Sequence, residues 1–359
     1  MKSEWTYRPL GELVSFASGG TPSKKRDDYW GGTIPWISAK TLKTENIDTS
    51  DLFITEEGLK AGSKIAPKGS ILLLTRGSGL FNGIPIARVE KDVAFNQDIK
   101  CLDSYGEVEN EFIFYWLLSQ KDYLMAKVGV TGIGAGKFDL DFLQKLMIPI
   151  PSERERKSIV GFASSISEKI RCNAKVNDNL EQQAAALFSS LYNRSNTEVR
   201  YTDLIQILGG GTPKTGETAY WNGNIAFFTP KDVGTPYTFI TEKTITEEGL
   251  SHCNSRLYPV NTVFVTARGT VGKVGLSGIP MAMNQSCYAL VGKETHQLLV
   301  YFYTLKAVDR LKHKASGAVF DAITTRDFDS EQIMKLSDDD AKAFLCVAEP
   351  MFQEMLNNS

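Results

Sequence analysis

The 359-residue chain contains an internal repeat that covers most of its length. The segment Gly19–Pro22 returns as Gly210–Pro213, and Glu56–Leu59 returns as Glu247–Leu250. Further matches occur in the same order: Tyr29-Trp30 with Tyr220-Trp221, Arg76-Gly77-Ser78 with Arg268-Gly269-Thr270, and Asn96-Gln97 with Asn284-Gln285. The period is far longer than the roughly 20 to 50 residues of stacked solenoid repeats, so each copy should fold by itself. The sequence therefore predicts a duplicated domain with two similar ligand sites, or two halves of one site.

The composition is that of an ordinary globular protein. Hydrophobic residues make up 42% of the chain and charged residues 23%, which suits about two domains that each bury a core. Residues 1–10 are polar and contain no apolar signal segment, and no run reaches the roughly 18 apolar residues of a membrane span. We therefore expect a cytoplasmic protein.

Neither a disulfide framework nor a metal site is expected. The five cysteines are an odd number, widely spaced and unrepeated between the copies, and the chain has only three histidines. No HExxH or CxxC motif is present. These cysteines are therefore interpreted as buried or incidental thiols rather than as disulfides or zinc ligands.

The charge balance does not by itself indicate a nucleic-acid binder. The formal net charge is −2, and no segment is strongly basic. A surface that binds phosphates would therefore have to arise in the folded chain, with basic side chains on one face and acidic side chains on another.

Each copy combines short β-rich runs with one helical stretch. The runs 70–75 and 262–266 indicate strands, and 111–128 and 297–315 indicate helices. This mixture predicts an α+β domain.

A long helix is predicted after each copy. Ser152 and Glu155 form a capping box, and apolar residues or Asn recur at seven-residue steps through Tyr192, a pattern that needs a partner helix. The positions are Ile159, Ile166, Asn173, Leu180 and Leu187, with Phe162 and Val176 between them. After the second copy, Ser337 is again a cap, followed by Phe344, Met351 and Asn358. An Asn at such a position fixes helix register, or, for Asn358 near the end, is merely solvated.

The predicted organisation is a first domain at 1–151, a helix at 152–195, a second domain at 196–336 and a shorter helix at 337–359. With this order and these motifs the chain resembles the specificity subunit of a Type I restriction-modification system. The motifs that carry the resemblance are the two Gly-Gly-Thr-Pro segments with their Tyr-Trp pairs, Arg268–Gly275, Asn284-Gln285, and Ile148–Pro151 before the capped helix.

The resemblance implies two target recognition domains, each of which reads one half of a split, asymmetric DNA site. The two long helices would pair as an antiparallel coiled coil that sets the spacing and docks modification subunits, and a motor and nuclease subunit would join for cleavage. S-adenosylmethionine, ATP and Mg²⁺ are then expected on the partner subunits and none on this chain. The short second helix departs from the family pattern, which leaves a Type IIB-like system open as an alternative.

Residues that both copies share cannot explain recognition of two different half-sites, so they are expected to be scaffold or phosphate contacts. Arg76 and Arg268 could bind phosphate or guanine, or could be buried in internal ion pairs. Asn96, Gln97, Asn284 and Gln285 could read adenine, although their repetition favours structural hydrogen bonds. The Tyr-Trp pairs are interpreted as core anchors.

Segments that differ between the copies are the better candidates for base reading, although solvated loop charge is the alternative for each. The differing segments are 24–26 against 215–217, 41–55 against 232–246, and 80–91 against 273–281. The remaining DNA-binding candidates are Lys24, Lys25, Arg26, Ser78, Lys137, Lys214, Thr270 and Lys273.

Catalytic motifs are hard to find. The chain has no Pro-Pro and so lacks the Asn/Asp-Pro-Pro-aromatic motif of base methyltransferases. The segment Gly132–Phe138 fits neither a P-loop nor GxGxxG, and it is interpreted as a flexible loop. We therefore expect a non-catalytic DNA-recognition subunit, with a tandem protein-interaction scaffold as the alternative from another class.

Overall fold

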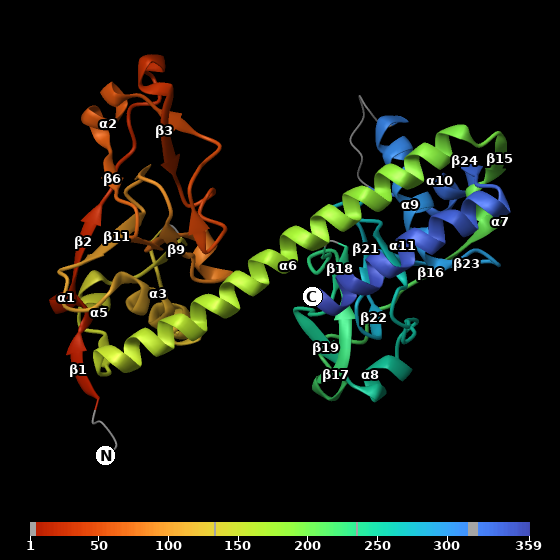
Figure 1. The fold of residues 1–359 in the computed structure, drawn as a ribbon. Coiled ribbons are helices and arrows are strands. Elements are labelled where there is room, and N and C mark those ends of the chain that lie inside the picture. Colours follow the sequence, from red (N-terminus) through yellow and green to blue (C-terminus); the bar gives the residue numbers. More distant parts are fainter. Residues whose placement is uncertain (1–4, 133, 235, 315–321) are drawn as a thin grey trace. The chain divides into compact units, whose positions relative to one another are not determined.

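The computed structural model describes residues 5–132, 134–234, 236–314 and 322–359. The chain forms two compact units, Met1–Glu168 and Lys169–Ser359 (Figure 1), and each is described here by itself. One helix, α6 (Glu153–Arg194), begins in the first unit and ends in the second.

The first unit is built on two main sheets. The larger has the order β2-β11-β7-β9-β4, and the smaller has the order β5-β3-β10-β6. Their bounds are β2 (Val14–Ser18), β3 (Trp30–Ile37), β4 (Asn46–Ile47), β5 (Phe53–Ile54), β6 (Lys64–Ala66), β7 (Ile71–Leu74), β9 (Ile86–Val89), β10 (Val93–Phe95) and β11 (Ile99–Ser104). All four residues of β7 are buried, so this strand lies at the centre of the core.

Shorter strands and helices complete the first unit. A three-stranded sheet joins β12 (Gly129–Val130), β13 (Gly136–Lys137) and β8 (Arg76–Gly77), while β1 (Thr6–Pro9) pairs with β14 (Met147–Ile150). The helices are α1 (Leu10–Leu13), α2 (Glu56–Gly62), α3 (Asn110–Ser119), α4 (Lys121–Met125) and α5 (Leu140–Gln144), with 3-10 turns η1 (Asp27–Tyr29) and η2 (Ser78–Phe81). The helix expected at 111–128 is thus broken into α3 and α4. The segment interpreted as a flexible loop contains strand β13 of a hairpin, although Ile133 lies outside the described residues.

The second unit repeats the main sheet strand for strand. Its order β16-β23-β20-β21-β18 matches β2-β11-β7-β9-β4 in sequence position and pairing, and a three-stranded sheet has the order β19-β17-β22. The bounds are β16 (Ile205–Gly209), β17 (Trp221–Phe228), β18 (Tyr237–Thr238), β19 (Lys243–Ile245), β20 (Val263–Thr266), β21 (Val274–Ser277), β22 (Met281–Met283) and β23 (Cys287–Gly292). The predicted duplication and the α+β class are confirmed.

The remaining elements of the second unit are mostly helical. β15 (Thr197–Arg200) pairs with β24 (Gln332–Lys335). The helices are α7 (Tyr201–Leu204), α8 (Glu247–Ser251), α9 (Gln297–Lys314), α10 (Thr325–Ser330) and α11 (Asp338–Asn358), with the 3-10 turn η3 (Thr218–Tyr220). Because α9 is unbroken and carries ten buried residues, the prediction at 297–315 is confirmed.

Close backbone packing explains two of the repeated glycine motifs. A Cβ at Gly19 would lie 2.0 Å from the carbonyl oxygen of Phe95, and one at Gly210 would lie 2.2 Å from that of Asn284. The glycine at position 58 approaches the Tyr29 carbonyl oxygen in the same way, at 2.4 Å. Only glycine fits such contacts, so these motifs belong to the shared scaffold.

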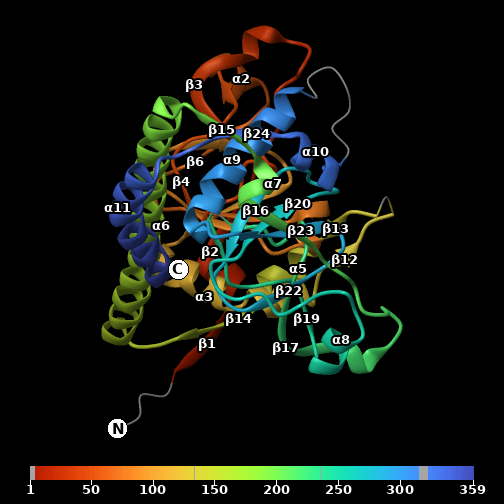
Figure 2. The same cartoon turned by 90° about the vertical axis from the view of Figure 1, so that its right-hand side faces the viewer.

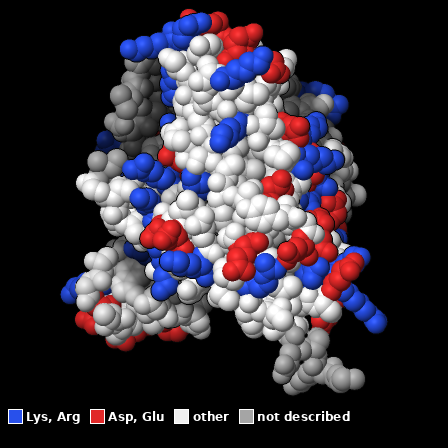
Figure 3. All heavy atoms as spheres, turned by 90° about the vertical axis from the view of Figure 1, so that its left-hand side faces the viewer, with Lys and Arg blue, Asp and Glu red and all other residues white. Residues whose placement is uncertain are grey.

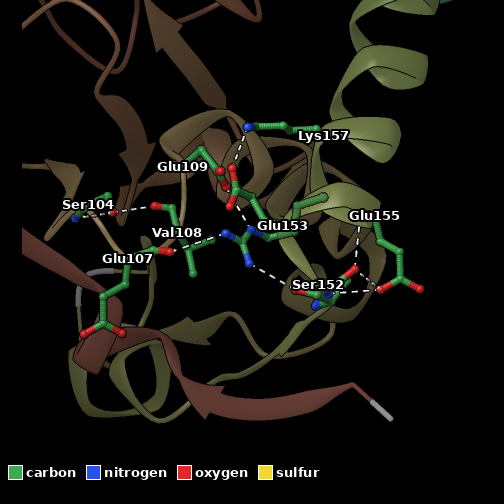
Figure 4. Close-up of polar contacts among 11 residues, drawn as sticks. Ser104, Glu107, Val108, Glu109, Ser152, Glu153, Glu155 and Lys157 are labelled. Carbon is green, nitrogen blue, oxygen red and sulfur yellow. Dashed lines mark hydrogen bonds and ion pairs between the residues drawn. The ribbon is translucent and has the colours of Figure 1, made fainter. Parts of the chain in front are cut away.

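The start of α6 is anchored to the first unit (Figure 4). Ser152 and Glu155 form the predicted capping box, in which the Glu155 carboxylate accepts from the Ser152 backbone N–H at 3.0 Å and the Ser152 hydroxyl accepts from the Glu155 N–H at 3.4 Å. One turn on, the Arg156 guanidinium donates to Glu109 at 2.9 Å and to the Pro151 carbonyl at 3.0 Å. The Arg156 hydrogen bond lowers the pKa of the Glu109 carboxyl. This contact fixes the direction in which the helix leaves the domain.

In the second unit, α11 runs antiparallel along the C-terminal part of α6 (Figures 1 and 2). Asn173 donates to the Asn358 carbonyl at 2.8 Å, and near the other end of α11 Arg194 lies 3.6 Å from Asp340. The side chain of Asn177 accepts from that of Asn358 at 3.2 Å. The repeated asparagines therefore do pair across the helices, and Asn177 is a member that the seven-residue pattern missed.

The seven-residue pattern identified only part of the buried helix face. Phe344 is fully buried, and Leu180, Leu187 and Met351 are partly buried against the core. Five further buried positions lie outside the predicted pattern: Ala184 and Phe188 on α6, and Ala348, Phe352 and Met355 on α11. Their spacing of three and four residues follows the straight α-helix period rather than a strict heptad.

The N-terminal part of the predicted stripe is exposed. Ile159, Phe162, Ile166 and Val176 are 37%, 72%, 46% and 39% exposed, and the unpredicted Ile170 is 64% exposed. The expectation that these positions lie in a coiled-coil core is wrong for this structure. Ile159, Phe162 and Ile166 lie outside the stretch of α6 that pairs with α11, which begins at Asn173. Val176 lies within that stretch but is still 39% exposed. We refer to Ile159, Phe162, Ile166 and Ile170 as the α6 stripe.

None of the described residues forms a group of acidic, histidine and cysteine side chains that could hold a metal ion. Within the same residues, no helix is long and apolar enough to cross a membrane. All five cysteines are free thiols, and Cys101 and Cys287 are buried.

Candidate nucleic-acid interface

In the first unit, strand pairing brings together candidates that lie far apart in the sequence. β8 and β13 pair antiparallel, which places Lys137 directly opposite Arg76. Both side chains are exposed. The alternative of a buried, ion-paired arginine is therefore wrong for Arg76. Two cations on neighbouring strands form a local donor surface that suits a phosphate or a base edge.

The two amides beside this surface have different surroundings. Asn96 is only 6% exposed, and its side-chain oxygen accepts from the Asp98 backbone N–H at 3.1 Å while its amide donates to the Asp98 carboxylate at 3.2 Å. Gln97 is exposed and accepts from the Thr21 hydroxyl at 2.7 Å. Asn96 thus closes a turn, whereas Gln97 presents its amide to solvent and ties the Gly-Gly-Thr-Pro segment to that turn.

Arg76, Gln97 and Lys137 line a pocket of about 390 Å³ in the first unit. Phe138 and Leu143, both buried, form its apolar floor. Its polar lining residues are Arg76, Gln97, Asp98, Lys100, Lys137 and Asp139. The pocket therefore offers hydrogen-bond donors and acceptors side by side above an apolar base.

The second unit has the same arrangement around Arg268. This residue forms a β-bridge with Ala322, as Arg76 pairs with Lys137. Gln285 accepts from the Thr212 hydroxyl, and Asn284 accepts from the Ser286 backbone N–H at 3.0 Å. Arg268 is exposed, so an internal ion pair is not its role. Two equivalent surfaces thus occur in the chain, one in each unit.

Other candidates lie away from this pocket. Arg26 pairs with Asp28 at 2.6 Å and lies over the Tyr29 ring, while Lys24 and Lys25 are exposed beside it. In the second unit the Lys214 carbonyl accepts from the Trp221 indole at 3.1 Å. These residues form the loop before β3 or β17, and they are not among the residues that line the pocket.

The Tyr-Trp pairs contribute to packing. Trp30 meets Trp36 edge to face with ring centroids 5.2 Å apart, and Trp221 meets Phe227 in the same way at 5.6 Å. Both tryptophans are partly buried against a small apolar cluster. Edge-to-face packing of this kind stabilises the scaffold, which agrees with the interpretation as core anchors.

The turns after the repeated arginines are exposed in both units. Ser78 begins η2, and Thr270 donates through its hydroxyl to the Pro230 carbonyl at 3.3 Å. Lys273 is exposed, and its backbone N–H donates to the Thr266 hydroxyl at 2.9 Å. The three side chains can reach solvent from the edge on which Arg76 or Arg268 lies.

The face of the molecule drawn in Figure 3 is not uniformly basic. In Figure 3, lysines and arginines are interspersed with acidic side chains. The phosphate-binding surface expected from sorted charges is thus absent from this view. Local donor groups such as the pair of Arg76 and Lys137 are the better candidates for anion contacts.

Three charged pocket residues were not predicted from the sequence: Asp98, Lys100 and Asp139, the N-cap of α5. Lys100 donates to Ser18 across the β2–β11 pair, and Asp98 closes the turn at Asn96. A comparison of the two copies could have identified Asp98 and Lys100. They align with Ser286 and Tyr288 within an otherwise similar segment.

The fold and the two equivalent surfaces define a protein with two tandem recognition domains. The chain belongs to the family of the Type I restriction modification DNA specificity domain, whose model matches residues 2–182 and 193–335. The two matched stretches correspond to the two copies of the repeat.

Individual relatives agree with this assignment. The chain is 31% identical over 161 residues to the specificity subunit of a Type I restriction enzyme from Escherichia coli, a match that covers 44% of this chain but only 40% of that protein. It is 22% identical over 388 aligned positions to such a subunit from Methanocaldococcus jannaschii, covering 99% of this chain and 88% of that protein.

A solved structure shares the fold. The crystal structure of the S subunit of a Type I restriction-modification system from M. genitalium superposes with a TM-score of 0.56 at 16% identity. The match covers 99% of this chain and 91% of that one.

Proposed function

We propose that this chain is the DNA-reading subunit of a Type I restriction-modification complex. Each unit reads one half of a bipartite, asymmetric DNA site in the major groove. The observation that carries the proposal is the pair of equivalent exposed surfaces, one around Arg76 and one around Arg268, on scaffolds with the same strand order. Two scaffolds with different surface residues can select two different half-sites.

The shared arginines are proposed to contact phosphate. Each guanidinium is exposed beside a glycine, so a DNA strand can approach closely. Gln97 and Gln285 are exposed next to them and can bond to the same strand. Phosphate contacts fix register without carrying sequence information, which suits residues that both units share.

The long helix α6 is proposed to set the spacing between the half-sites and to dock modification subunits. Its capping box and the Arg156–Glu109 contact tie it to the first unit, and its pairing with α11 belongs to the second. The α6 stripe is apolar and exposed. Exposed apolar rows on a helix suit a partner helix, and we assign the modification subunit to this position.

The chain itself is proposed to be non-catalytic. Transfer of the methyl group from S-adenosylmethionine, and any ATP- and Mg²⁺-dependent cleavage, would take place on the partner subunits, in the cytoplasm where the host DNA is found. This proposal is supported by the family to which the chain belongs.

The test is methylome sequencing of cells that express the chain with the modification subunit of its system. A methylated motif in two parts, separated by a gap of unspecified bases, is the expected result. A parallel sample lacks the chain and should show no such motif. Cells without any motif, while the two subunits still co-purify, would instead favour an assembly scaffold that does not read DNA.

A further inference from the structure

The pocket beside Arg76 and the equivalent surface beside Arg268 have the same backbone frame but different polar side chains. Lys137 pairs with Arg76 as Ala322 pairs with Arg268. Asp139 caps α5 as Thr324 caps α10. The four differing pairs are Asp98 and Ser286, Lys100 and Tyr288, Lys137 and Ala322, and Asp139 and Thr324. At all four positions a charged residue in the first unit is matched by a neutral one in the second.

One of these differences extends to the neighbouring strand. In the first unit Lys100 faces Ser18 across the β2–β11 pair and donates to its hydroxyl. In the second unit the equivalent partners are Tyr288 and Gly209, and nothing lies within 4 Å of the place where a Cβ on this glycine would be. A lysine and a serine in the first unit are thus replaced by a tyrosine and a glycine in the second.

Part of the frame around the differing residues is held by backbone bonds that do not involve their side chains. The turn at Asn96 is closed through the backbone N–H of Asp98, and that at Asn284 through the backbone N–H of Ser286. Backbone bonds also join Phe138 to Thr75 at 3.0 Å. These backbone bonds hold the turn and the strand when the side chains at Asp98, Lys100 and Lys137 are changed, which is what a specificity site requires. Asp139 and Thr324 differ from them because their side chains also cap α5 and α10.

The two sets of side chains suit different base pairs. Lysine donates to guanine O6 and N7, and an aspartate accepts from cytosine N4, so Lys100, Lys137 and Asp98 together match the major-groove edge of a G·C pair. In the second unit Ala322 and the methyl group of Thr324 suit apolar contact with the thymine methyl group. Ser286 and Tyr288 add neutral hydrogen-bonding groups.

We propose that this pocket in the first unit and the equivalent surface in the second are the base-reading sites, with a G·C pair as ligand in the first unit and an A·T pair in the second. The proposal rests on the proposed function, because it names the base chemistry of the same DNA-reading surface. It separates two roles: Arg76 and Arg268 hold the phosphate backbone, and the four differing positions select the base pair.

The experiment exchanges the pocket chemistry within one chain. Ser18→Gly, Asp98→Ser, Lys100→Tyr and Lys137→Ala give the first unit the residues of the second at three of the differing positions and at the strand partner of Lys100. Asp139 is kept because its side chain caps α5. The full chain and its modification subunit are expressed together, and the methylated motif is sequenced. We expect one position of one half-site to change from G·C to A·T, with roughly a tenfold change in preference, while the other half-site stays as it is.

Two further variants keep the result interpretable if the fourfold variant does not fold. Lys137→Ala changes one exposed side chain to the residue that the second unit already has, and it should weaken the preference for guanine at the same position. The reciprocal pair Ser286→Asp with Ala322→Lys should shift the other half-site toward G·C.

The outcomes separate this proposal from the function it rests on. If the unaltered chain gives no bipartite motif, the proposed function fails. If the unaltered chain gives the motif and the folded variants methylate an unchanged motif, the pocket does not read bases and this inference is overturned while the function stands.

Discussion

At the scale of single residues, the molecule separates side chains that repeat from side chains that differ. The repeated glycines, tryptophans and Asn96 make backbone or packing contacts, while the repeated arginines are exposed. Repetition alone could not distinguish these roles, because a scaffold glycine and a phosphate-binding arginine are both retained in a duplication. The exposure of each side chain in the structure distinguishes the two roles, because the scaffold residues are packed and the arginines are exposed.

Arg76→Ala is expected to weaken DNA binding without lowering stability, because the guanidinium is exposed. Loss of one phosphate contact should lower the slope of log affinity against log salt by about 1. Binding of the purified complex to its recognised duplex across a salt series, with thermal melting alongside, measures both. Lys60→Ala removes an exposed charge outside the pocket and serves as the control. A lowered melting temperature with unchanged affinity would make Arg76 a structural residue.

The Glu109–Arg156 contact should give the first unit a pH-dependent contribution to stability. Arg156 lowers the pKa of the Glu109 carboxyl in the folded state. The contribution to stability is therefore present at pH values above the unfolded-state pKa of the Glu109 carboxyl, about 4.3. It is lost as the pH falls through the lower pKa of this carboxyl in the folded state. Because the Glu109 side chain is 44% exposed, we expect it to be about 1 kcal/mol or less.

Thermal melting of Glu109→Gln and the unaltered chain, followed by tryptophan fluorescence, tests this contact. Four of the five tryptophans lie in the first unit. The difference in melting temperature should be present at pH 7 and should shrink below about pH 4. Glu198→Gln, an exposed glutamate in the second unit, is the control. A difference that does not vary with pH would show that the carboxylate charge is not what stabilises the contact.

At the scale of elements, α6 has two different environments along its length. From Asn173 to Arg194 it packs on α11 and the second core, and Phe188 is only 1% exposed. From Ile159 to Ile170 its apolar row is exposed. The same apolar period thus stabilises the fold in one half of the helix and remains available to a partner in the other.

Two phenylalanines on this helix should therefore behave in opposite ways. Phe188→Ala removes a ring that contacts Phe302, Tyr303 and Phe344, and it should destabilise the second unit by about 3–5 kcal/mol. Phe162→Ala removes an exposed ring and should change stability by less than about 0.5 kcal/mol.

Assembly with the modification subunit should depend on Phe162, the phenylalanine that contributes little to stability. Phe162→Ala should weaken association with the modification subunit, measured by analytical ultracentrifugation of the mixed subunits. Ser165→Ala, on the exposed surface of the same helix, is the matched control. If Phe162→Ala assembles like the control, the α6 stripe is not the docking surface.

The element-level predictions succeeded where a local signal was complete. The capping boxes, the long helices and the main strands had such signals, so their positions matched the structure. The break between α3 and α4 at Gln120 was missed because no proline or glycine marks it. The pocket was missed because it depends on the pairing of β8 with β13, which joins Arg76 to Lys137 across sixty positions of sequence. Tertiary pairing of this kind leaves no local pattern.

At the scale of the whole molecule, α6 is one uninterrupted helix of 42 residues. Under the proposed function its length sets the gap in the recognised DNA. Seven residues inserted after Glu168 would add two turns, or about 10 Å, which corresponds to about three base pairs at 3.4 Å each. Methylome sequencing should show both half-sites unchanged and a longer gap. An unchanged gap would show that the helix length does not set it.

The α6 stripe also affects the chain before it meets a partner. Isoleucine and phenylalanine side chains left in water along one helix face favour contact with any other apolar surface, including the same face of another copy. Under the proposed function, a chain made in excess of its modification subunit would therefore be expected to self-associate through this face. The balance of subunit synthesis then decides how much DNA-reading protein is available, without any change in its affinity for DNA.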